Sequence, residues 1–278
     1  EDFEMLKSDI IFFDNNATTF KPKEVVDAVV EYYTKYTSNA HRGDYKTSLK
    51  VDMRYEEVRE LVKDYINAES SKEIVFTSGA TDSLNMVAFG FFKNILKKGD
   101  EVLITKLEHA SNVLPWLELE SEIGIKVKYA KLDENLKLTP KSLEESLTKN
   151  TKLVSLAHVT NTIGDVRDIE KIGEILKKKN IYFVVDAAQS IGHRKIDVRR
   201  SNIDFLAFSG HKMLGPTGVG VLYGKYDLLV KMHPTRVGGG MNSYFESDGS
   251  FMYHEPPSKF EAGTGNIAGV IGLGSAIK

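Results

Sequence analysis

The chain has 278 residues, 41% of them hydrophobic and 27% charged, with a formal net charge of −2 and no cysteine. This is typical of a globular protein with one large or two ordinary domains; it indicates no basic surface for nucleic acid or anionic membrane and excludes disulfides and thiolate metal sites. No apolar run approaches the ~18 residues of a transmembrane helix, and the acidic N-terminus lacks a signal-peptide pattern, so the default location is cytoplasmic.

Short apolar runs alternate with amphipathic stretches along the chain. In chain order, we expect a strand at 10–13, helices at 22–36 and 51–66, a strand at 74–76, a helix at 81–96, strands at 102–104 and 127–130, a helix at 142–147, a strand at 153–156, a helix at 169–178, and strands at 181–185, 205–208 and 219–223. Continuously apolar strands between helices are typical of parallel sheets that are covered on both faces. The sequence therefore predicts an α/β fold with a mostly parallel sheet flanked by helices.

The C-terminal part has a less regular pattern. Three glycines at 238–240 precede a stretch, about 241–259, that we expect to be irregular, and residues 266–278 are typical of an apolar helix rich in small residues. An apolar helix of this kind favours contact with a partner subunit. Because no capping signal ends the pattern, two interpretations stay open: a frayed terminal helix, or a missing C-terminal part.

Polar residues follow the apolar strands, where ligands bind in open α/β sheets. These positions hold Ala80 and Thr81 after 74–76, His109 after 102–104, Asn161 after 153–156, Asp186 and Gln189 after 181–185, and Ser209, His211 and Lys212 after 205–208. Taken singly, each residue has an ordinary structural explanation, such as a helix cap, an ion-pair partner, a buried histidine or a surface lysine. Their occurrence at five strand ends of one sheet favours a binding site.

This set of side chains matches the needs of pyridoxal 5′-phosphate (PLP). PLP requires a lysine amine for a Schiff base and an acid beside its pyridine nitrogen, and Lys212 and Asp186 can supply them. The turn at 78–81 opens a helix, whose free N–H groups and dipole favour a phosphate. His109 can stack on the ring, and Gln189 can hydrogen-bond the phenolic oxygen. The sequence contains no dinucleotide-binding glycine motif, no phosphate-loop motif and no H-E-x-x-H metal spacing.

Several motifs, in this order, resemble those of class V PLP enzymes, and more narrowly those of the cysteine desulfurase and selenocysteine lyase family in the sulfur-mobilisation branch. They are DNNATT (14–19), HRG (41–43), TSGAT (77–81), EHASN (108–112), DAAQ (186–189), SGHK with GPTG (209–212 and 215–218) and FEAGT (260–264). The resemblance runs from about residue 10 to the end and implies that residues 1–278 are a PLP-dependent transferase large domain of fold type I. Family members carry a catalytic cysteine and a carboxylate-binding arginine in a C-terminal small domain, which we expect to be absent from this chain.

The resemblance also implies roles for individual residues. Lys212 would hold PLP as a Schiff base, Asp186 would pair with the pyridine nitrogen, Gln189 would bond the phenolic oxygen and His109 would stack on the ring. The phosphate would be bound by Ala80, Thr81, Ser209 and His211, and by Thr264 from the partner subunit of a homodimer. Asn161 would face the substrate carboxylate, and His41 and Arg42 would lie near the mouth of the pocket.

The function that this resemblance implies is conversion of L-cysteine to L-alanine, with sulfur passing as a persulfide to an acceptor protein for iron–sulfur cluster assembly. Because the chain contains no cysteine, we expect it to bind PLP but not to transfer sulfur by itself. Asp44-Tyr45, Asp165 and Gly265 depart from the family pattern and leave the substrate open. A selenocysteine lyase, a class V aminotransferase and a non-catalytic PLP-binding dimerisation module are the alternatives.

Overall fold

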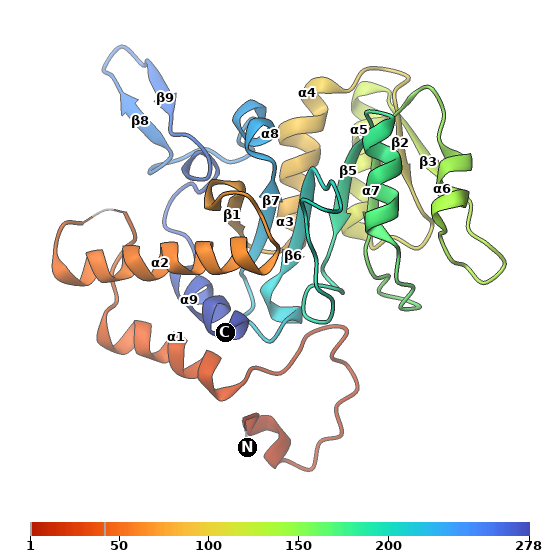
Figure 1. Cartoon of the computed structure of the whole chain (residues 1–278). Coiled ribbons are helices and arrows are strands. Elements are labelled where there is room, and N and C mark those ends of the chain that lie inside the picture. Colours follow the sequence, from red (N-terminus) through yellow and green to blue (C-terminus); the bar gives the residue numbers. More distant parts are fainter. Residues whose placement is uncertain (1, 42) are drawn as a thin grey trace.

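The computed structural model of the chain describes residues 2–41 and 43–278 (Figure 1). These residues form a seven-stranded sheet with the order β1-β7-β6-β5-β4-β2-β3. The strands are β1 (Ile74–Thr77), β2 (Glu101–Ile104), β3 (Lys126–Tyr129), β4 (Thr151–Ala157), β5 (Tyr182–Asp186), β6 (Phe205–Ser209) and β7 (Gly220–Gly224). β7 is antiparallel to both of its neighbours, and the remaining pairs are parallel. The predicted α/β fold with a mostly parallel sheet is therefore confirmed.

Helices cover both faces of this sheet. They are α1 (Lys23–Lys35), α2 (Lys46–Tyr65), α3 (Ala80–Asn85), α4 (Lys93–Ile95), α5 (Leu114–Ile123), α6 (Pro140–Ser146), α7 (Ile169–Lys178), α8 (Tyr226–Lys231) and α9 (Ile267–Ile277). A π-helical segment, Met86–Phe92, joins α3 to α4. The single helix expected at 81–96 is therefore present, and its middle part is π-helical.

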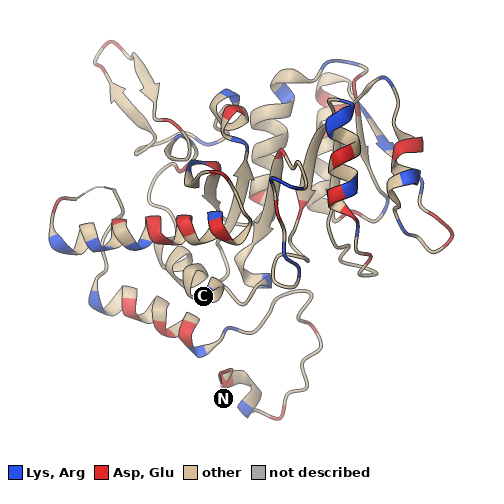
Figure 2. Cartoon of the chain, in the orientation of Figure 1, with Lys and Arg blue, Asp and Glu red and all other residues tan. Residues whose placement is uncertain are grey.

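Two hydrophobic cores form because successive side chains of a strand point to opposite faces of the sheet. Val154 and Leu156 of β4 belong to the core that includes residues of α2, α7 and α9. Leu153, which directly precedes Val154 and points to the other face, belongs to the core that includes the α3–α4 helix, α5 and α8. Figure 2 shows that charged residues recur along α2 and α7, whereas the central strands carry few.

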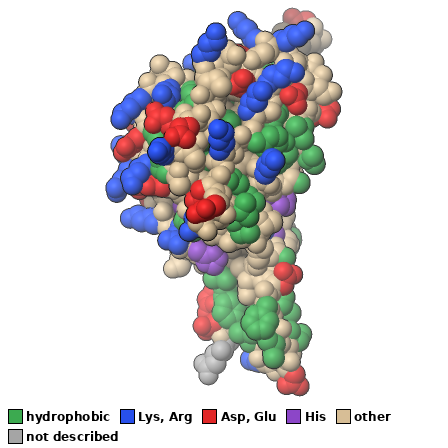
Figure 3. All heavy atoms as spheres, turned by 90° about the vertical axis from the view of Figure 1, so that its right-hand side faces the viewer, with side chains coloured by type: hydrophobic (Ala, Val, Ile, Leu, Met, Phe, Trp, Pro, Cys, Tyr) green, Lys and Arg blue, Asp and Glu red, His purple; other side chains and the backbone are tan. Residues whose placement is uncertain are grey.

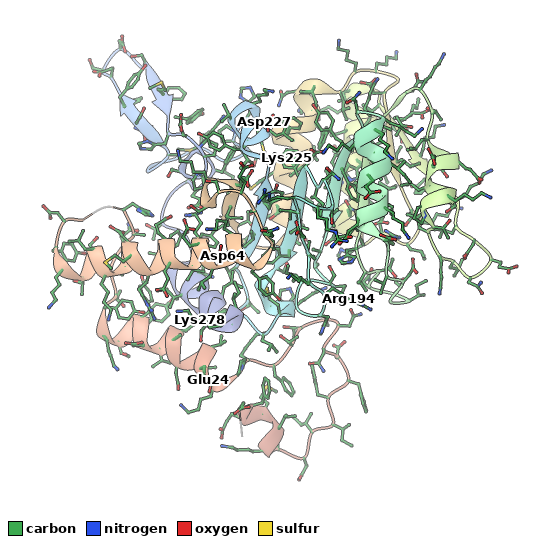
Figure 4. The ribbon with its side chains drawn as sticks, in the orientation of Figure 1. Glu24, Asp64, Arg194, Lys225, Asp227 and Lys278 are labelled. Carbon is green, nitrogen blue, oxygen red and sulfur yellow. The ribbon has the colours of Figure 1, made fainter. Side chains whose placement is uncertain are left out.

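The terminal helix α9 packs against α1 and α2 of its own chain. Its residues from Ile267 to Gly274 are all buried, and a Cβ atom on Gly274 would collide with the side chain of Val58 in α2. Lys278, labelled in Figure 4, forms an ion pair with Glu57 of α2 at 2.7 Å. The expectation that this helix presents an apolar face to a partner subunit is therefore wrong, because elements of the same chain cover it.

Residues 10–13 are not a strand, contrary to the expectation. None of the described strands pairs with them, Ile11 and Phe13 are 81% and 92% exposed, and Phe12 stacks on Phe20 with ring centroids 4.4 Å apart. A strand needs a neighbour that completes its backbone hydrogen bonds, and this segment has none among the described residues. In Figure 3 the N-terminal segment forms the narrow lower projection, where hydrophobic side chains lie at the surface.

The expectation of an irregular stretch at 241–259 is also wrong in part. The strands β8 (Asn242–Phe245) and β9 (Phe251–Tyr253) form an antiparallel hairpin that projects from the body of the molecule (Figure 1). The connecting turn contains Asp248 and Gly249, and Gly249 has a φ of +86°. Asp-Gly is a preferred hairpin turn because glycine adopts positive φ without steric cost, so the sequence contained the signal for this hairpin.

Candidate active site

A cavity of about 240 Å³ lies at the carboxyl ends of β1, β2, β4, β5 and β6, and we call it the Lys212 cavity. It is lined by Ala80, Thr81, His109, Ser111, Ala157, Val159, Asn161, Asp186, Ala188, Gln189, Ser209, His211 and Lys212. Every cofactor-binding residue predicted from the five strand ends is in this set, whereas His158, which also follows the strand at 153–156, is not. The sheet therefore brings together the amine, carboxylate, imidazole, amide and hydroxyl groups that the sequence placed on separate elements.

The turn from β1 into α3 forms one wall of the cavity. Ala80 N donates to Ser209 Oγ at 2.8 Å, which links the start of α3 to the end of β6. Gly220 permits this contact, because a Cβ atom at that position would overlap the backbone of Gly79 in the turn. Helix N-termini carry free N–H groups and a partial positive charge, so this wall is suited to bind an anion.

Lys212 and Asp186 lie at the ends of the adjacent strands β6 and β5. Burial lowers the pKa of the Lys212 amine, and the nearby Asp186 acts in the opposite direction. Burial raises the pKa of the Asp186 carboxyl, whose Oδ1 accepts a hydrogen bond from Ala188 N at 2.9 Å. A lysine with a lowered pKa has more neutral amine at a given pH, and the neutral amine is the form that attacks a carbonyl.

His109 is oriented by Ser111, a residue that the sequence-based prediction did not include. His109 Nδ1 lies 3.1 Å from Ser111 N, and a backbone N–H can only donate, so Nδ1 is the acceptor. The proton of the neutral imidazole is therefore on Nε2. Ser111 Oγ also lies 2.7 Å from Thr81 Oγ1, so one hydroxyl connects the imidazole to the start of α3. No periodic pattern in the sequence marks such a contact.

The N-terminal segment holds the opposite wall in place. The carbonyl oxygen of His211, directly before Lys212, accepts hydrogen bonds from Thr19 N at 3.0 Å and from Lys21 Nζ at 3.0 Å. Gln189 Nε2 donates to Asn16 O at 3.0 Å. Asn16 Nδ2 in turn donates to Asn161 O at 3.0 Å. Residues 16–21 thus fix three segments of the Lys212 cavity, a role that the sequence of the motif at 14–19 does not by itself indicate.

His158 lies one residue beyond β4, between two lining residues of the Lys212 cavity. It is buried and its Nδ1 has no hydrogen-bond partner among the described residues. Burial lowers its pKa to about 4, and the charge of Arg194 contributes in the same direction. Arg194 follows β5 and is labelled in Figure 4. This histidine is therefore neutral near pH 7 and serves the packing beneath the site.

Thr264 and His41 line a different, larger cavity of about 500 Å³, which we call the Thr264 cavity. Thr264 Oγ1 accepts from Asn39 Nδ2 at 3.0 Å. His41 Nε2 lies 3.4 Å from a carboxylate oxygen of Glu56, and the hydrogen bond to Glu56 raises the pKa of His41. Arg42 lies outside the described residues. The proposed contact of Thr264 with a partner subunit's coenzyme stays a prediction.

The described ranges, 2–41 and 43–278, contain neither a membrane-spanning helix nor a cluster of metal ligands. No helix there combines the length and apolarity that crossing a membrane requires. No group of three or more histidine, aspartate or glutamate side chains there gathers as metal ligands would.

Known proteins share both the sequence and the fold of this chain. The family described as Aminotransferase class-V matches residues 11–278. A protein of Borreliella burgdorferi named "Probable cysteine desulfurase" is 48% identical over 97% of this chain and 65% of its own length. Its namesake from Pyrococcus abyssi is 43% identical over 98% of this chain and 67% of its own length. This chain thus spans about two thirds of the length of these relatives.

Solved structures agree with these matches. The apo structure of a cysteine desulfurase from Thermococcus onnurineus NA1 has a TM-score of 0.94 and 42% identity, covering 99% of this chain and 68% of that one. The Escherichia coli cysteine desulfurase CsdA, in its S-sulfonic acid form, has a TM-score of 0.91 and 38% identity, covering 99% and 69%. The expected fold type I is therefore confirmed. From its sequence and its fold together, the chain belongs to the class V aminotransferase family, in the branch of the cysteine desulfurases.

Proposed function

We propose that the chain binds PLP through Lys212 and forms the coenzyme-binding part of a cysteine desulfurase. The observation that carries this proposal is the placement of an amine and a buried carboxylate, Lys212 and Asp186, at adjacent strand ends of one cavity. An anion-binding helix start and an oriented imidazole share that cavity. A lone lysine–carboxylate pair would be an ordinary ion pair, but this combination supplies the groups that PLP chemistry requires.

The residues of the Lys212 cavity fit the groups of PLP. The start of α3, with Thr81 and Ser209, suits the phosphate, and His109 suits the face of the ring. Asp186 would hold a proton on the pyridine nitrogen, and Lys212 would bond the carbonyl carbon. When bound, PLP would supply an electron sink for negative charge on the α-carbon of an amino acid.

Other residues of the chain would orient the substrate and exclude water. Asn161 is held by Asn16 through its backbone oxygen, which leaves the Asn161 side chain free to face the carboxylate of an amino acid. His109 presents its Nε2–H form because Ser111 fixes Nδ1 as an acceptor. The segment that contains Asn16 also contacts Gln189, so one wall is closed by backbone and amide groups.

The names of the relatives point to L-cysteine as the substrate. We propose that sulfur leaves as a persulfide and passes to an acceptor protein for iron–sulfur cluster assembly, and that the protein acts as a homodimer in which Thr264 reaches the partner's site. Persulfide formation needs a cysteine thiolate, and these 278 residues contain none. The direct test of this chain is therefore coenzyme binding.

The test is to load the chain with PLP, reduce it with borohydride and map the modified peptide. We expect the pyridoxyl group on Lys212, and we expect Lys212→Ala to lose both the yellow absorbance and the label. Lys259→Ala is the matched control, because burial also lowers the pKa of Lys259, which lies outside the Lys212 cavity. A label on another lysine, or wild-type labelling of Lys212→Ala, would contradict the proposal.

A further inference from the structure

A buried ion pair lies directly behind the Lys212 cavity. The side chains of Glu108 and Arg167 are both 0% exposed, and Arg167 Nη1 donates to Glu108 Oε1. Neither side chain lines the cavity, and the function proposed above does not use them. Moving two charges out of water costs free energy that their attraction offsets only in part, so stability alone is a weak reason for such a pair.

Hydrogen bonds anchor this pair on the strand that neighbours Asp186. Arg167 donates to Ala157 O at 3.0 Å and to Thr105 Oγ1 at 2.8 Å. Glu108 accepts from Thr105 Oγ1 (2.6 Å), Asn112 Nδ2 (3.0 Å) and Ala157 N (2.6 Å). Ala157 is the register partner of Asp186. The Glu108 carboxylate is therefore bound to the backbone of the residue that lies beside Asp186 in the sheet.

Two carboxylates thus share one buried region. Burial raises the pKa of the Asp186 carboxyl, and the negative charge of Glu108 raises it further. The hydrogen bond from Ala188 N and the charges of His109 and Lys212 lower it. These groups come from Asp186's own segment, from the segment after β2 and from the turn after β6. The charge of Glu108 therefore works against an ionised Asp186 unless a cation compensates it.

We propose that Arg167 is a positioning residue that keeps Asp186 anionic by neutralising Glu108. The proposal rests on the function proposed above, in which Asp186 carries a negative charge beside a protonated ring nitrogen. Without the arginine charge, the uncompensated charge of Glu108 would favour the protonated form of the Asp186 carboxyl. Glu108 would keep three other donors, whereas Asp186 accepts one hydrogen bond, from Ala188 N. Asp186 is therefore the group that would be protonated.

The test follows the Asp186 carboxyl by ¹³C NMR in the chain labelled at aspartate, with no coenzyme added and with Asp186→Asn to assign the signal. We expect Arg167→Met to raise the titration midpoint of Asp186 by about one pH unit or more. Adding Glu108→Gln to Arg167→Met removes the Glu108 charge and leaves only Asp165, whose Oδ2 lies 3.9 Å from Arg167 Nε, without its cation, so the midpoint should return toward the wild-type value. A purely structural role for Arg167 predicts no such restoration. An unchanged midpoint in Arg167→Met, or an equal shift in the double variant, would overturn the proposal.

Arg59→Met is the matched control. Arg59 is 2% exposed and pairs with Glu261 at 2.8 Å in the wall of the Thr264 cavity, so its loss also breaks a buried pair. It should destabilise the fold without moving the Asp186 midpoint; an equal shift there would contradict the proposal.

If Arg167→Met does not fold, the single variant Glu108→Gln tests the proposal instead. Glu108→Gln alone should lower the Asp186 midpoint, because it removes a negative charge and leaves Arg167 in place; a midpoint that stays or rises would overturn the proposal. Since no PLP is present in these titrations, failure of the chain to bind PLP would refute the proposed function and leave this measurement intact.

Discussion

The Lys212 cavity and the Thr264 cavity flank the same turn, between β1 and α3, yet they are built differently. Thr77 and Ser78 face the larger cavity, while Ala80 and Thr81 face the smaller one. In the larger cavity Glu261 already accepts from Arg59 and from Phe76 N. In the Lys212 cavity Asp186 accepts one backbone hydrogen bond. A carboxylate that already has its partners, such as Glu261, serves structure, whereas a buried carboxylate with one donor is available to a ligand.

The largest expected difference between the two cavities is the effect on PLP affinity when one carboxylate in each is neutralised. Asp186→Asn should weaken PLP binding about 100-fold or more, because a hydrogen bond to a charged group contributes about 3 kcal/mol. Glu261→Gln should leave PLP affinity within about threefold of wild type, since Glu261 serves Arg59 and not the ligand. Equilibrium titrations followed by absorbance would measure both values. Equal losses in the two variants would show that the cavities do not differ in the way described.

The two cavities also differ in how well the sequence predicts them, because different kinds of element form their walls. The residues of the Lys212 cavity follow apolar strands, and the carboxyl ends of parallel strands meet at one edge, so Asp186 and Lys212 were predictable together. The Thr264 cavity is formed by residues of α2, β1 and α9 and by loops that lie far apart in the sequence. Thr264 and His41 were assigned by resemblance alone, and the structure places them away from Lys212.

The supporting contacts of the Lys212 cavity were not predictable from sequence. Glu108 and Arg167 are 59 residues apart, and neither shows a pattern that distinguishes a buried charge from a surface one. Residues 16–21 have no secondary structure whose period reveals their contacts with His211. These supporting residues come together only because the ends of the strands lie at one edge of the folded sheet. Their contacts are therefore set by the tertiary structure and not by any local pattern in the sequence.

The two cavities should also differ, by a smaller amount, in how protonation of a nearby histidine changes the free energy of unfolding. Burial lowers the pKa of His158, beneath the Lys212 cavity, to about 4, and the unfolded chain binds this proton near the ordinary value of about 6.5. Between these two values the unfolded state holds more protons, so the free energy of unfolding falls as the pH falls. We expect this histidine to account for roughly 2–3 kcal/mol of that loss, measured by denaturant unfolding from pH 7 to pH 4.

His41 in the Thr264 cavity should respond in the opposite direction. The hydrogen bond to Glu56 raises its pKa, so its contribution is present at low pH and is lost as the pH rises through the folded value. His158→Asn should flatten the slope of stability against pH between about pH 4 and pH 6.5, and His41→Asn should make the slope above about pH 6.5 more positive. The slope is the readout, so an overall loss of stability in either variant does not obscure the result. Matching slopes in both variants would contradict the assignment of opposite shifts.

The smallest expected effect concerns Thr264 and would connect the two cavities. In this chain the Thr264 hydroxyl binds Asn39 and lies outside the Lys212 cavity, so it cannot bind the same subunit's coenzyme without moving. If two copies share their sites, Thr264→Ala should weaken PLP binding about tenfold, since one hydrogen bond to a phosphate contributes about 1.4 kcal/mol. The loss should appear only at protein concentrations at which sedimentation shows a dimer. Ser258→Ala, in the same cavity wall, is the control and should have no effect at either concentration. A tenfold loss in a monomer would instead mean that Thr264 reaches the coenzyme of its own chain, and no loss in a dimer would remove Thr264 from the site.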